Sequence, residues 1–231
     1  MEKLKLDGFI NRYNLGGEVE SVMVNSTDKN VSVKMISDDK TLLGDVTVTE
    51  KEFPTGDFGI YTTSQLKGLL SVLDSSFKVE EVTGALKFSD KGTKVQYMLA
   101  APSVIPAVPD LKALPSFDSD LTLDDEFVSK FIKSKGALAD ADTFTFTCKD
   151  NKGEIILGYS SINSNRISIN VNCVCDTDIE PIAFSAKYLK AILMANKGSN
   201  TSSLKISSKG LAHLAFTDGD YVSNYYLVEI K

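Results

Sequence analysis

Apolar residues recur at helical spacing in four separate segments of the chain. Within each segment they fall three or four residues apart, which places them along one stripe of an α-helix. We therefore predict four amphipathic helices, with Asp7 or Asp124 suited to cap a helix start. The apolar positions are Leu6, Phe9, Ile10 and Tyr13; Leu66, Leu69, Leu70 and Leu73; Phe127, Val128, Phe131 and Ile132; and Tyr188, Leu189, Ile192 and Leu193.

Alternation of apolar and polar residues fills the stretches after each predicted helix. Val31, Val33 and Met35 share one face, as expected for a half-buried strand. The last strand is predicted at 225–230. Turns are predicted at 90–92, 208–210 and 218–220. Because strands follow one another rather than alternating with helices, the fold class is α+β: in each half, two helices packed on antiparallel sheets of about eight strands.

The two halves of the chain resemble each other. The segment 86–92 matches 204–210 at five of seven positions, and Phe9 aligns with Phe127 at the same offset of 118 residues. The segment 66–70 matches 189–193 at a similar offset. Four of the six prolines lie between the halves, which favours an extended, stiff connector. We therefore predict tandem duplicated domains at 1–103 and 118–231, joined by a connector at 104–117.

Composition places the chain among ordinary globular proteins, with 42% hydrophobic and 24% charged residues. The N-terminus lacks the apolar core of a signal peptide, so a cytoplasmic location is expected. Three cysteines without such a peptide argue against a disulfide framework. Alternation across 167–175 indicates one strand on which Cys173 and Cys175 act as small apolar residues. A metal or redox role for this pair is the weaker interpretation, because zinc sites usually need two ligand pairs.

The net charge of −6 argues against nucleic-acid binding unless the positive charge is gathered on one surface. The predicted helical segments hold ten basic and six acidic residues, which leaves −10 on the rest of the chain. If both helices of each domain line one surface, that surface is positive. A merely solvated helix face is the alternative. The segments counted are 2–16, 63–74, 121–137 and 185–198.

The sequence lacks the motifs of common enzymes. Its one histidine, His213, reads as a partly packed strand residue, and no nucleophile elbow or phosphate-binding glycine loop accompanies it. The acidic run 124–126 fits a helix start better than a metal site. We therefore expect no catalysis, no catalytic residues, no cofactor and no metal.

At the level of the whole chain, the sequence resembles the sliding clamps of the proliferating cell nuclear antigen (PCNA) type, and more closely the short clamps of tailed phages. The likeness rests on the tandem domain, the proline-rich connector, the helix at 66–70, and Tyr225-Tyr226-Leu227 after the turn at 218–220. It implies a viral homotrimeric ring in the host-cell cytoplasm. This processivity factor for DNA replication would encircle double-stranded DNA without base specificity, tether the DNA polymerase and be opened by a clamp loader, with no membrane association. The DNA-facing residues would be Lys5, Arg12, Lys67, Lys130, Lys133, Lys187, Lys190 and Lys197.

The resemblance also implies a pocket for partner peptides beneath the connector. Apolar residues in an exposed connector favour docking, although they are also compatible with packing of the connector itself. This chain has Gly210 where the cellular clamp has proline, and it lacks an acidic tail beyond the last strand. A duplicated β-rich virion structural protein is the alternative function. The matching pocket positions are Val104, Ile105, Pro106 and Leu111; Ile36 and Leu42; and Gly210, Tyr226, Val228 and Ile230.

Overall fold

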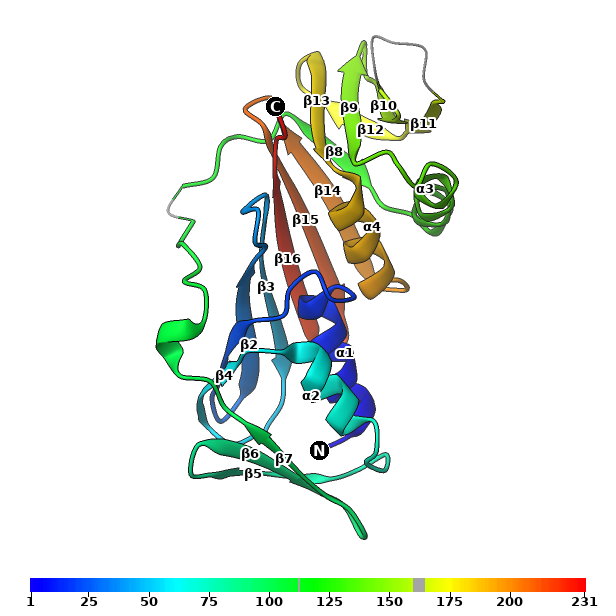
Figure 1. Ribbon diagram of the computed structural model, residues 1–231. Helices are drawn as coiled ribbons and strands as arrows, with labels where there is room; N and C mark the ends of the chain where they lie inside the picture. Colours follow the sequence, from blue (N-terminus) through cyan, green and yellow to red (C-terminus); the bar gives the residue numbers. More distant parts are fainter. Residues whose placement is uncertain (112, 160–164) are drawn as a thin grey trace. The chain divides into compact units, whose positions relative to one another are not determined.

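The computed structural model describes residues 1–111, 113–159 and 165–231, so Lys112 of the predicted connector lies outside the described residues. The chain divides into two compact units. Unit 1 contains Met1–Asp38, Gly44–Pro109 and Asp220–Ser223. Unit 2 contains Asp39–Leu43, Asp110–Gly219 and Asn224–Lys231. Both units contain helices and antiparallel sheets, which confirms the predicted α+β class (Figure 1).

Unit 1 contributes strands to two sheets. The strand orders are β3-β2-β1-β4 and β5-β6-β7. The β1–β2, β1–β4, β5–β6 and β6–β7 pairs are antiparallel. Its elements are α1 (Lys3–Asn14), β1 (Val22–Ser26), β2 (Asn30–Ile36), β3 (Leu42–Thr49), β4 (Gly56–Ile60), α2 (Thr63–Leu70), β5 (Lys78–Val82), β6 (Ala85–Ser89), β7 (Lys94–Met98) and the short 3₁₀ turn η1 (Pro102–Val104).

The predicted apolar stripe holds α1 in place. Its four apolar residues are at most 4% exposed, and they share the core of unit 1 with side chains from β1, β2, β4, α2 and β6. Asp7 does not cap this helix, so that prediction is wrong. The helix begins at Lys3, whose backbone N–H donates to the Ser75 carbonyl at 2.9 Å. This bond satisfies one of the unpaired N–H groups of the first turn and sets the start one turn before Asp7.

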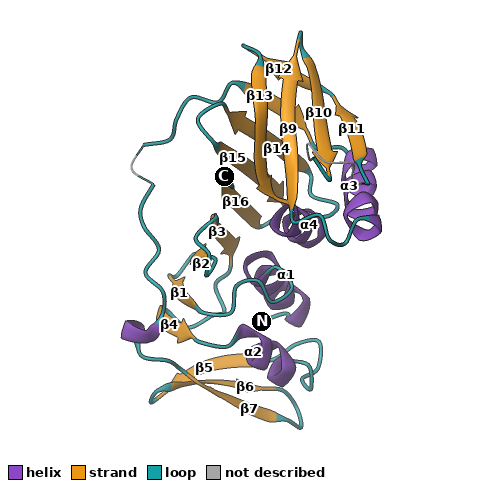
Figure 2. Cartoon of the chain, turned by 45° about the horizontal axis from the view of Figure 1, so that its top comes forward, coloured by secondary structure: helices purple, strands orange, loops and turns teal. Residues whose placement is uncertain are grey.

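Helix α2 is shorter than predicted. It ends at Leu70, although Leu73 is still buried beyond it. The Lys3 ammonium group donates to the carbonyls of Ser71 and Leu73 at 3.0 and 2.8 Å, which satisfies acceptors that a longer helix would have used. In both ribbon views α2 lies beside the β5–β7 sheet (Figures 1 and 2).

Unit 2 likewise contributes strands to two sheets and contains two helices. The strand orders are β12-β8-β14-β15-β16 and β11-β10-β9-β13. Helix α3 packs against α4 and β11 (Figure 2). Its elements are β8 (Ser119–Thr122), α3 (Asp125–Ala137), β9 (Thr143–Lys149), β10 (Lys152–Leu157), β11 (Ile167–Val171), β12 (Cys173–Cys175), β13 (Ile179–Ser185), α4 (Ala186–Ala195), β14 (Thr201–Ser207), β15 (Leu211–Asp218) and β16 (Tyr221–Val228), whose first residues fall in unit 1.

Side chains cap both helices of unit 2. The Asp124 carboxylate accepts a hydrogen bond from the Phe127 N–H at 2.7 Å, which confirms the predicted cap of α3. The Ser185 hydroxyl accepts one from the Tyr188 N–H at 3.3 Å at the start of α4. At the other end of α4, the buried Asn196 amide donates to the Tyr225 hydroxyl at 2.9 Å, which fixes the helix to β16.

The strand predicted across 167–175 is wrong. The structure breaks it at Asn172 into β11 and β12, which belong to different sheets. Cys148 of β9 and Cys175 of β12 form a disulfide, contrary to the expectation from composition. Because β9 and β12 lie in the two separate sheets of unit 2, the bond joins those sheets. The last strand is also shifted: β16 starts at Tyr221 and ends at Val228.

None of the helices in the described part of the chain has the length and hydropathy that crossing a bilayer requires.

Candidate nucleic-acid interface

In unit 1, helices α1 and α2 lie in contact and share one polar link. The Lys67 ammonium group on α2 donates to the Asn11 side-chain oxygen on α1 at 2.9 Å. Lys67 is the sole charged residue within Thr63–Leu70. It is half-buried and sits where the two helices meet. Its hydrogen-bond partner is a neutral amide, and its positive charge also acts on the Glu20 carboxylate, whose pKa it helps to lower.

Two other predicted DNA-facing residues of unit 1 are engaged inside the unit. Lys5 pairs with Asp220 at 2.8 Å and with Glu50 at 3.7 Å. The hydrogen bond to Asp220 raises the pKa of Lys5, against the opposing effect of burial. Arg12, which the resemblance assigns to the DNA-facing set, is 8% exposed. Its guanidinium group stacks 4.0 Å from the centre of the Tyr221 ring, which explains how a charged head group is buried there.

The helices and helix ends of unit 2 expose more of the predicted DNA-facing lysines than those of unit 1 do. Lys130, Lys133, Lys187 and Lys197 are exposed, and Lys190 is half-buried. Helix α4 contains two lysines and no acidic residue within Ala186–Ala195. Lys130 pairs with Glu126 one turn away at 3.4 Å, but both side chains are more than half exposed. Such a pair is weak in water, so Lys130 stays available to an anionic ligand.

The predicted partner-binding residues of unit 2 differ widely in exposure. Leu42 is fully buried, whereas Leu111 is 44% and Val228 is 36% exposed. Tyr226 and Ile230 are half-buried. Backbone hydrogen bonds bring part of this set together, because Val228 N–H donates to Thr41 and Glu229 N–H donates to Gly210, both at 2.9 Å. Leu42 therefore supports this surface from behind rather than forming it.

The remaining partner-binding predictions lie in unit 1. Val104 ends the η1 turn and is 54% exposed, and Pro106 is also exposed. Ile105 and Ile36 are half-buried. Val104, Ile105 and Pro106 lie outside the named strands, and their role in docking a partner stays a prediction.

An aromatic stack on unit 2 was not foreseen. The Tyr226 ring stacks on His213 with centroids 4.6 Å apart and 9° between the planes, and Phe117 flanks the histidine at 5.8 Å. A histidine nitrogen lies 3.1 Å from the Asn224 side-chain oxygen. These contacts confirm His213 as a partly packed strand residue. His213 lies two residues from Leu211 and two from Ala215 on β15. Residues two apart on a strand point to the same face, so this spacing was the sequence feature that could have predicted its packing.

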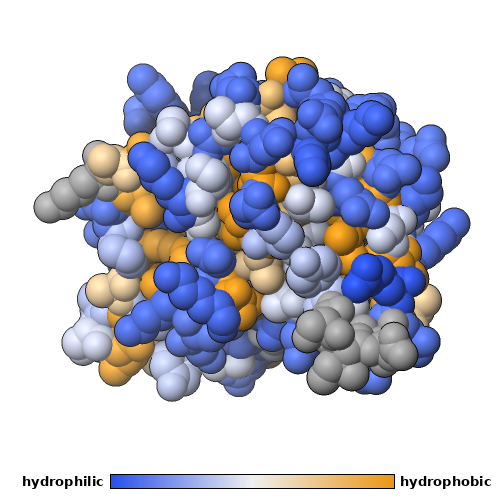
Figure 3. All heavy atoms as spheres, turned by 90° about the horizontal axis from the view of Figure 1, so that it is seen from above, coloured by the Kyte–Doolittle hydropathy of each residue, from blue (hydrophilic) through white to orange (hydrophobic). Residues whose placement is uncertain are grey.

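The three cysteines are the residues in the described part of the chain that come close enough to share a metal ion. Cys173 is free beside the Cys148–Cys175 disulfide. Burial raises the pKa of the Cys173 thiol, which disfavours a nucleophilic thiolate. In the surface view, hydrophilic side chains dominate and hydrophobic residues appear in small separate patches (Figure 3).

Two helices packed on antiparallel sheets in each unit match the fold of the PCNA-type sliding clamps. PCNA from Entamoeba histolytica matches at a TM-score of 0.77 and 14% identity, covering 100% of this chain and 96% of that one. A. fulgidus PCNA, solved with the C-terminal region of FEN-1 bound, matches at a TM-score of 0.77 and 14% identity, covering 100% of this chain and 97% of that one. The PCNA2–PCNA3 complex from Sulfolobus tokodaii matches at a TM-score of 0.74 and 13% identity, covering 97% of this chain and 96% of that one. No protein-family profile and no curated protein matches the sequence.

Proposed function

We propose that this chain is a sliding clamp: a processivity factor that encircles duplex DNA and tethers the replicative DNA polymerase. The observation that carries the proposal is the fold, because the match to PCNA extends over the whole chain. Holding DNA by enclosure requires no active site, in keeping with a sequence that lacks common enzyme motifs. If the chain is viral, the ring would act in the cytoplasm of the host cell.

Three copies would form the ring. In this proposal each chain supplies two clamp domains, at 1–103 and 118–231, linked by the connector at 104–117. Head-to-tail contacts that complete a rotation close a ring of identical chains. The Sulfolobus tokodaii PCNA2–PCNA3 complex supports an assembly built from chains of this fold.

Exposed lysines on the helices would face the DNA. We propose Lys67, Lys130, Lys133, Lys187, Lys190 and Lys197 for this role. Lysine contacts to phosphate position the protein without reading sequence, and each one exchanges readily with salt. Lys5 and Arg12 would first have to leave Asp220 and Tyr221, so their predicted contribution is indirect.

Partners would dock as short peptides on the surface formed by the connector and the end of β16. The A. fulgidus PCNA bound to the C-terminal region of FEN-1 supports a peptide-binding role for this fold. In this proposal Tyr226, Val228, Ile230, Gly210, Leu111, Val104, Ile105, Pro106 and Ile36 contact the peptide, with Leu42 behind them. The DNA polymerase and the clamp loader are the partners proposed.

The deciding experiment compares closed and cut DNA circles. Sedimentation at micromolar concentration should give the mass of a trimer. Cross-linked rings assembled on nicked circular DNA should co-elute with that DNA during gel filtration. Cutting the circle should release the protein, since linear DNA has ends over which a ring can slide. Equal retention on cut and uncut circles would refute enclosure. A protein that neither trimerises nor stays on circles would fit the virion structural alternative.

A further inference from the structure

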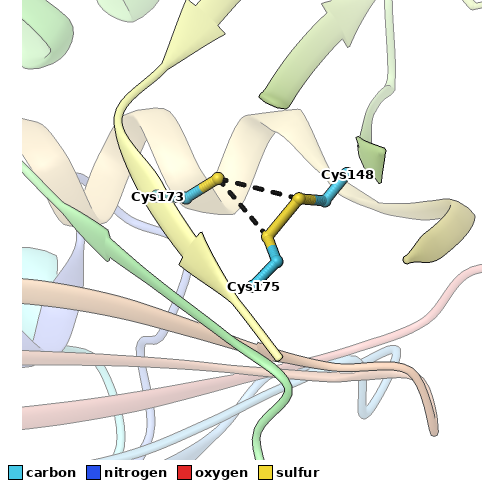
Figure 4. A group of neighbouring side chains, drawn as sticks. All are labelled: Cys148, Cys173 and Cys175. Carbon is cyan, nitrogen blue, oxygen red and sulfur yellow. Dashed lines mark hydrogen bonds between the residues drawn. A yellow bond between two sulfur atoms is a disulfide. The ribbon is translucent and has the colours of Figure 1, made fainter. Parts of the chain in front are cut away.

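Three cysteine sulfurs from two sheets of unit 2 meet at one point. Cys148 comes from β9, and Cys173 and Cys175 come from β12, with all three Sγ atoms within 4.8 Å of one another. Cys173 Sγ lies 3.4 Å from Cys175 Sγ and 3.9 Å from Cys148 Sγ (Figure 4). Cys173 and Cys175 are two residues apart on a strand, so their side chains leave it on the same side.

The cluster contains one more sulfur than a disulfide needs. Cys148 and Cys175 are bonded, and Cys173 points at both of them (Figure 4). The Cα atoms of the bonded pair are 6.9 Å apart, just beyond the usual upper limit of about 6.8 Å for disulfides. A pair of thiolates bridged by a metal ion tolerates a wider backbone separation than a direct bond between the sulfurs does.

We propose that the reduced cluster is a binding site for a thiophilic d10 cation, zinc in particular, with Cys148, Cys173 and Cys175 as thiolate ligands. Tetrahedral zinc with Zn–S bonds of about 2.3 Å requires sulfurs roughly 3.8 Å apart. The two separations from Cys173, 3.4 and 3.9 Å, already bracket this value. The third separation reaches it once the disulfide is reduced.

Metal binding requires two-electron reduction of the disulfide, which a dithiol can supply. One thiolate of the dithiol attacks a sulfur of the Cys148–Cys175 bond, and its second thiol resolves the mixed disulfide. The products are two cysteine thiols and the oxidised dithiol, so two electrons and two protons are transferred to the protein. The three cysteine thiols then release their protons when they coordinate the cation.

The surroundings of the cluster suit a bound ion. Cys148 is 1% exposed, whereas Cys173 and Cys175 are half-buried, so the ion has access from the β12 side. Gly153 on β10 leaves the space beside Cys173 free, since a Cβ at this position would collide with the Cys173 sulfur. The Asn151 side-chain oxygen accepts from the Cys175 N–H at 3.2 Å and fixes the backbone of that ligand.

A metal at this point would tie the two sheets of unit 2 together. Strand β12 is the edge of one sheet, and β9 lies inside the other. Because the folded state holds the three ligands together and the unfolded chain does not, zinc binding should raise the melting temperature. At zinc a hundredfold above its dissociation constant, the expected rise is roughly 5 °C or more.

The test uses the full chain reduced with a phosphine and titrated with Cd²⁺, whose bonds to thiolate absorb in the ultraviolet. One equivalent should saturate the absorption, and Zn²⁺ should displace the Cd²⁺. Cys173→Ser is the decisive variant, because it removes a proposed ligand and leaves the disulfide pair intact. It should bind at least about 100-fold more weakly, since even the loss of a group that supports a metal ligand costs 10- to 100-fold.

Two controls keep the result interpretable. Oxidised Cys173→Ser should still form the Cys148–Cys175 disulfide, which shows that the variant folds. Asp176→Asn with Asp178→Asn removes the two exposed carboxylates of the β12–β13 connection and should leave Cd²⁺ affinity unchanged. Unaltered binding by Cys173→Ser would overturn the proposal, as would the absence of stoichiometric thiolate absorption in the reduced wild type. An equal loss in the carboxylate variant would assign the ion to aspartates instead.

Discussion

Helix α3 relies on one side chain at its start. Asp124 accepts a hydrogen bond from the Phe127 N–H at 2.7 Å, whereas Asp125 lies one residue later inside the helix. Asp124→Ala should lower the free energy of unfolding by about 1 kcal/mol, because an N–H of the first turn loses its partner. Urea unfolding followed by circular dichroism measures the change.

Asp125→Ala is the matched control for the cap. It removes the same charge from the first turn and keeps the cap bond, so it should cost only a few tenths of a kcal/mol. Equal losses in the two variants would show that charge at the helix start, rather than the cap, stabilises α3.

Gly210 occupies a backbone conformation that other residues rarely adopt. Its φ is +83°, and an added Cβ would lie 2.6 Å from a Glu229 carboxylate oxygen. Gly210→Ala should therefore destabilise the protein by about 1–3 kcal/mol through strain and crowding together. Thermal unfolding compared with Gly219→Ala separates the two effects, because Gly219 has a φ of +55° and no neighbouring atom within 4 Å. A larger loss at Gly219 would contradict this account.

Some of these residue-level features follow from sequence and others do not. The Asp124 cap is local, since aspartate directly before an apolar stripe specifies it. Asp7 has the same local signal, but the bond from Lys3 to the distant Ser75 moves the start of α1. Arg12 is buried because it meets Tyr221, more than 200 residues later in the chain. The cysteine cluster likewise depends on a break at Asn172 that periodicity did not reveal.

At the scale of elements, α2 is a short helix held by a loop carboxylate. Glu20 accepts a hydrogen bond from the Ser64 N–H at 2.8 Å and a further bond from the Ser64 hydroxyl. The Glu20 backbone carbonyl also accepts from the Thr63 N–H at 3.0 Å. Because a helix of eight residues is marginal by itself, these bonds and the burial of Leu66 and Leu70 hold it in place.

The stabilising effect of Glu20 should depend on pH. Burial alone would raise its pKa, but the hydrogen bonds from Ser64 and Asn14 outweigh burial and hold the pKa below its ordinary 4.5. Because the pKa of Glu20 is lowered by folding, its carboxylate stabilises the folded state fully above about pH 4.5. This stabilisation disappears as the pH falls through the pKa of Glu20 in the folded protein. Glu20→Gln should therefore melt below wild type at pH 7, and the difference should shrink toward pH 3. A difference that stays constant would rule out a role for the charge.

The order and type of these elements were accessible from the sequence. Helical spacing located the four α-helices of the described residues, and alternation placed Val31, Val33 and Met35 on a buried face, where each is at most 1% exposed. The ends of the elements were less accessible. Leu73 continues the apolar spacing of α2, yet the helix ends at Leu70. The Leu73 carbonyl accepts instead from Lys3, which lies far away in the sequence, so local spacing does not predict this end. The last strand starts four residues early because a tight turn at Gly219 allows β16 to begin at once.

At the scale of the whole molecule, the −6 net charge conceals an uneven distribution. The helices of unit 2 present exposed lysines, and α4 has no acid within its bounds. In unit 1, two of the basic helix residues are held by contacts within the unit: Lys5 pairs with Asp220, and Arg12 stacks on Tyr221. If the clamp proposal is correct, the second domain supplies most of the attraction for DNA, an asymmetry that repeat-level similarity does not reveal.

Removing lysines from α4 tests this idea directly. Lys187→Ala with Lys190→Ala should weaken binding to linear duplex DNA and reduce the slope of log affinity against log salt by about 0.9 for each phosphate that is no longer neutralised. Retention on a closed circle should fall much less, because enclosure rather than attraction holds the protein there. Fluorescence anisotropy at several salt concentrations measures the first effect, and gel filtration with circular DNA measures the second.

Lys149→Ala with Lys152→Ala is the matched control. These lysines are exposed at the end of β9 and the start of β10 in the same unit, so the net charge changes equally. Non-specific attraction by net charge alone would weaken DNA binding by the same factor in both variants. A contact surface on the helices weakens binding in the α4 variant alone. Equal salt slopes for the two variants would therefore remove the helices from the DNA-facing role, whatever the assembly state of the ring.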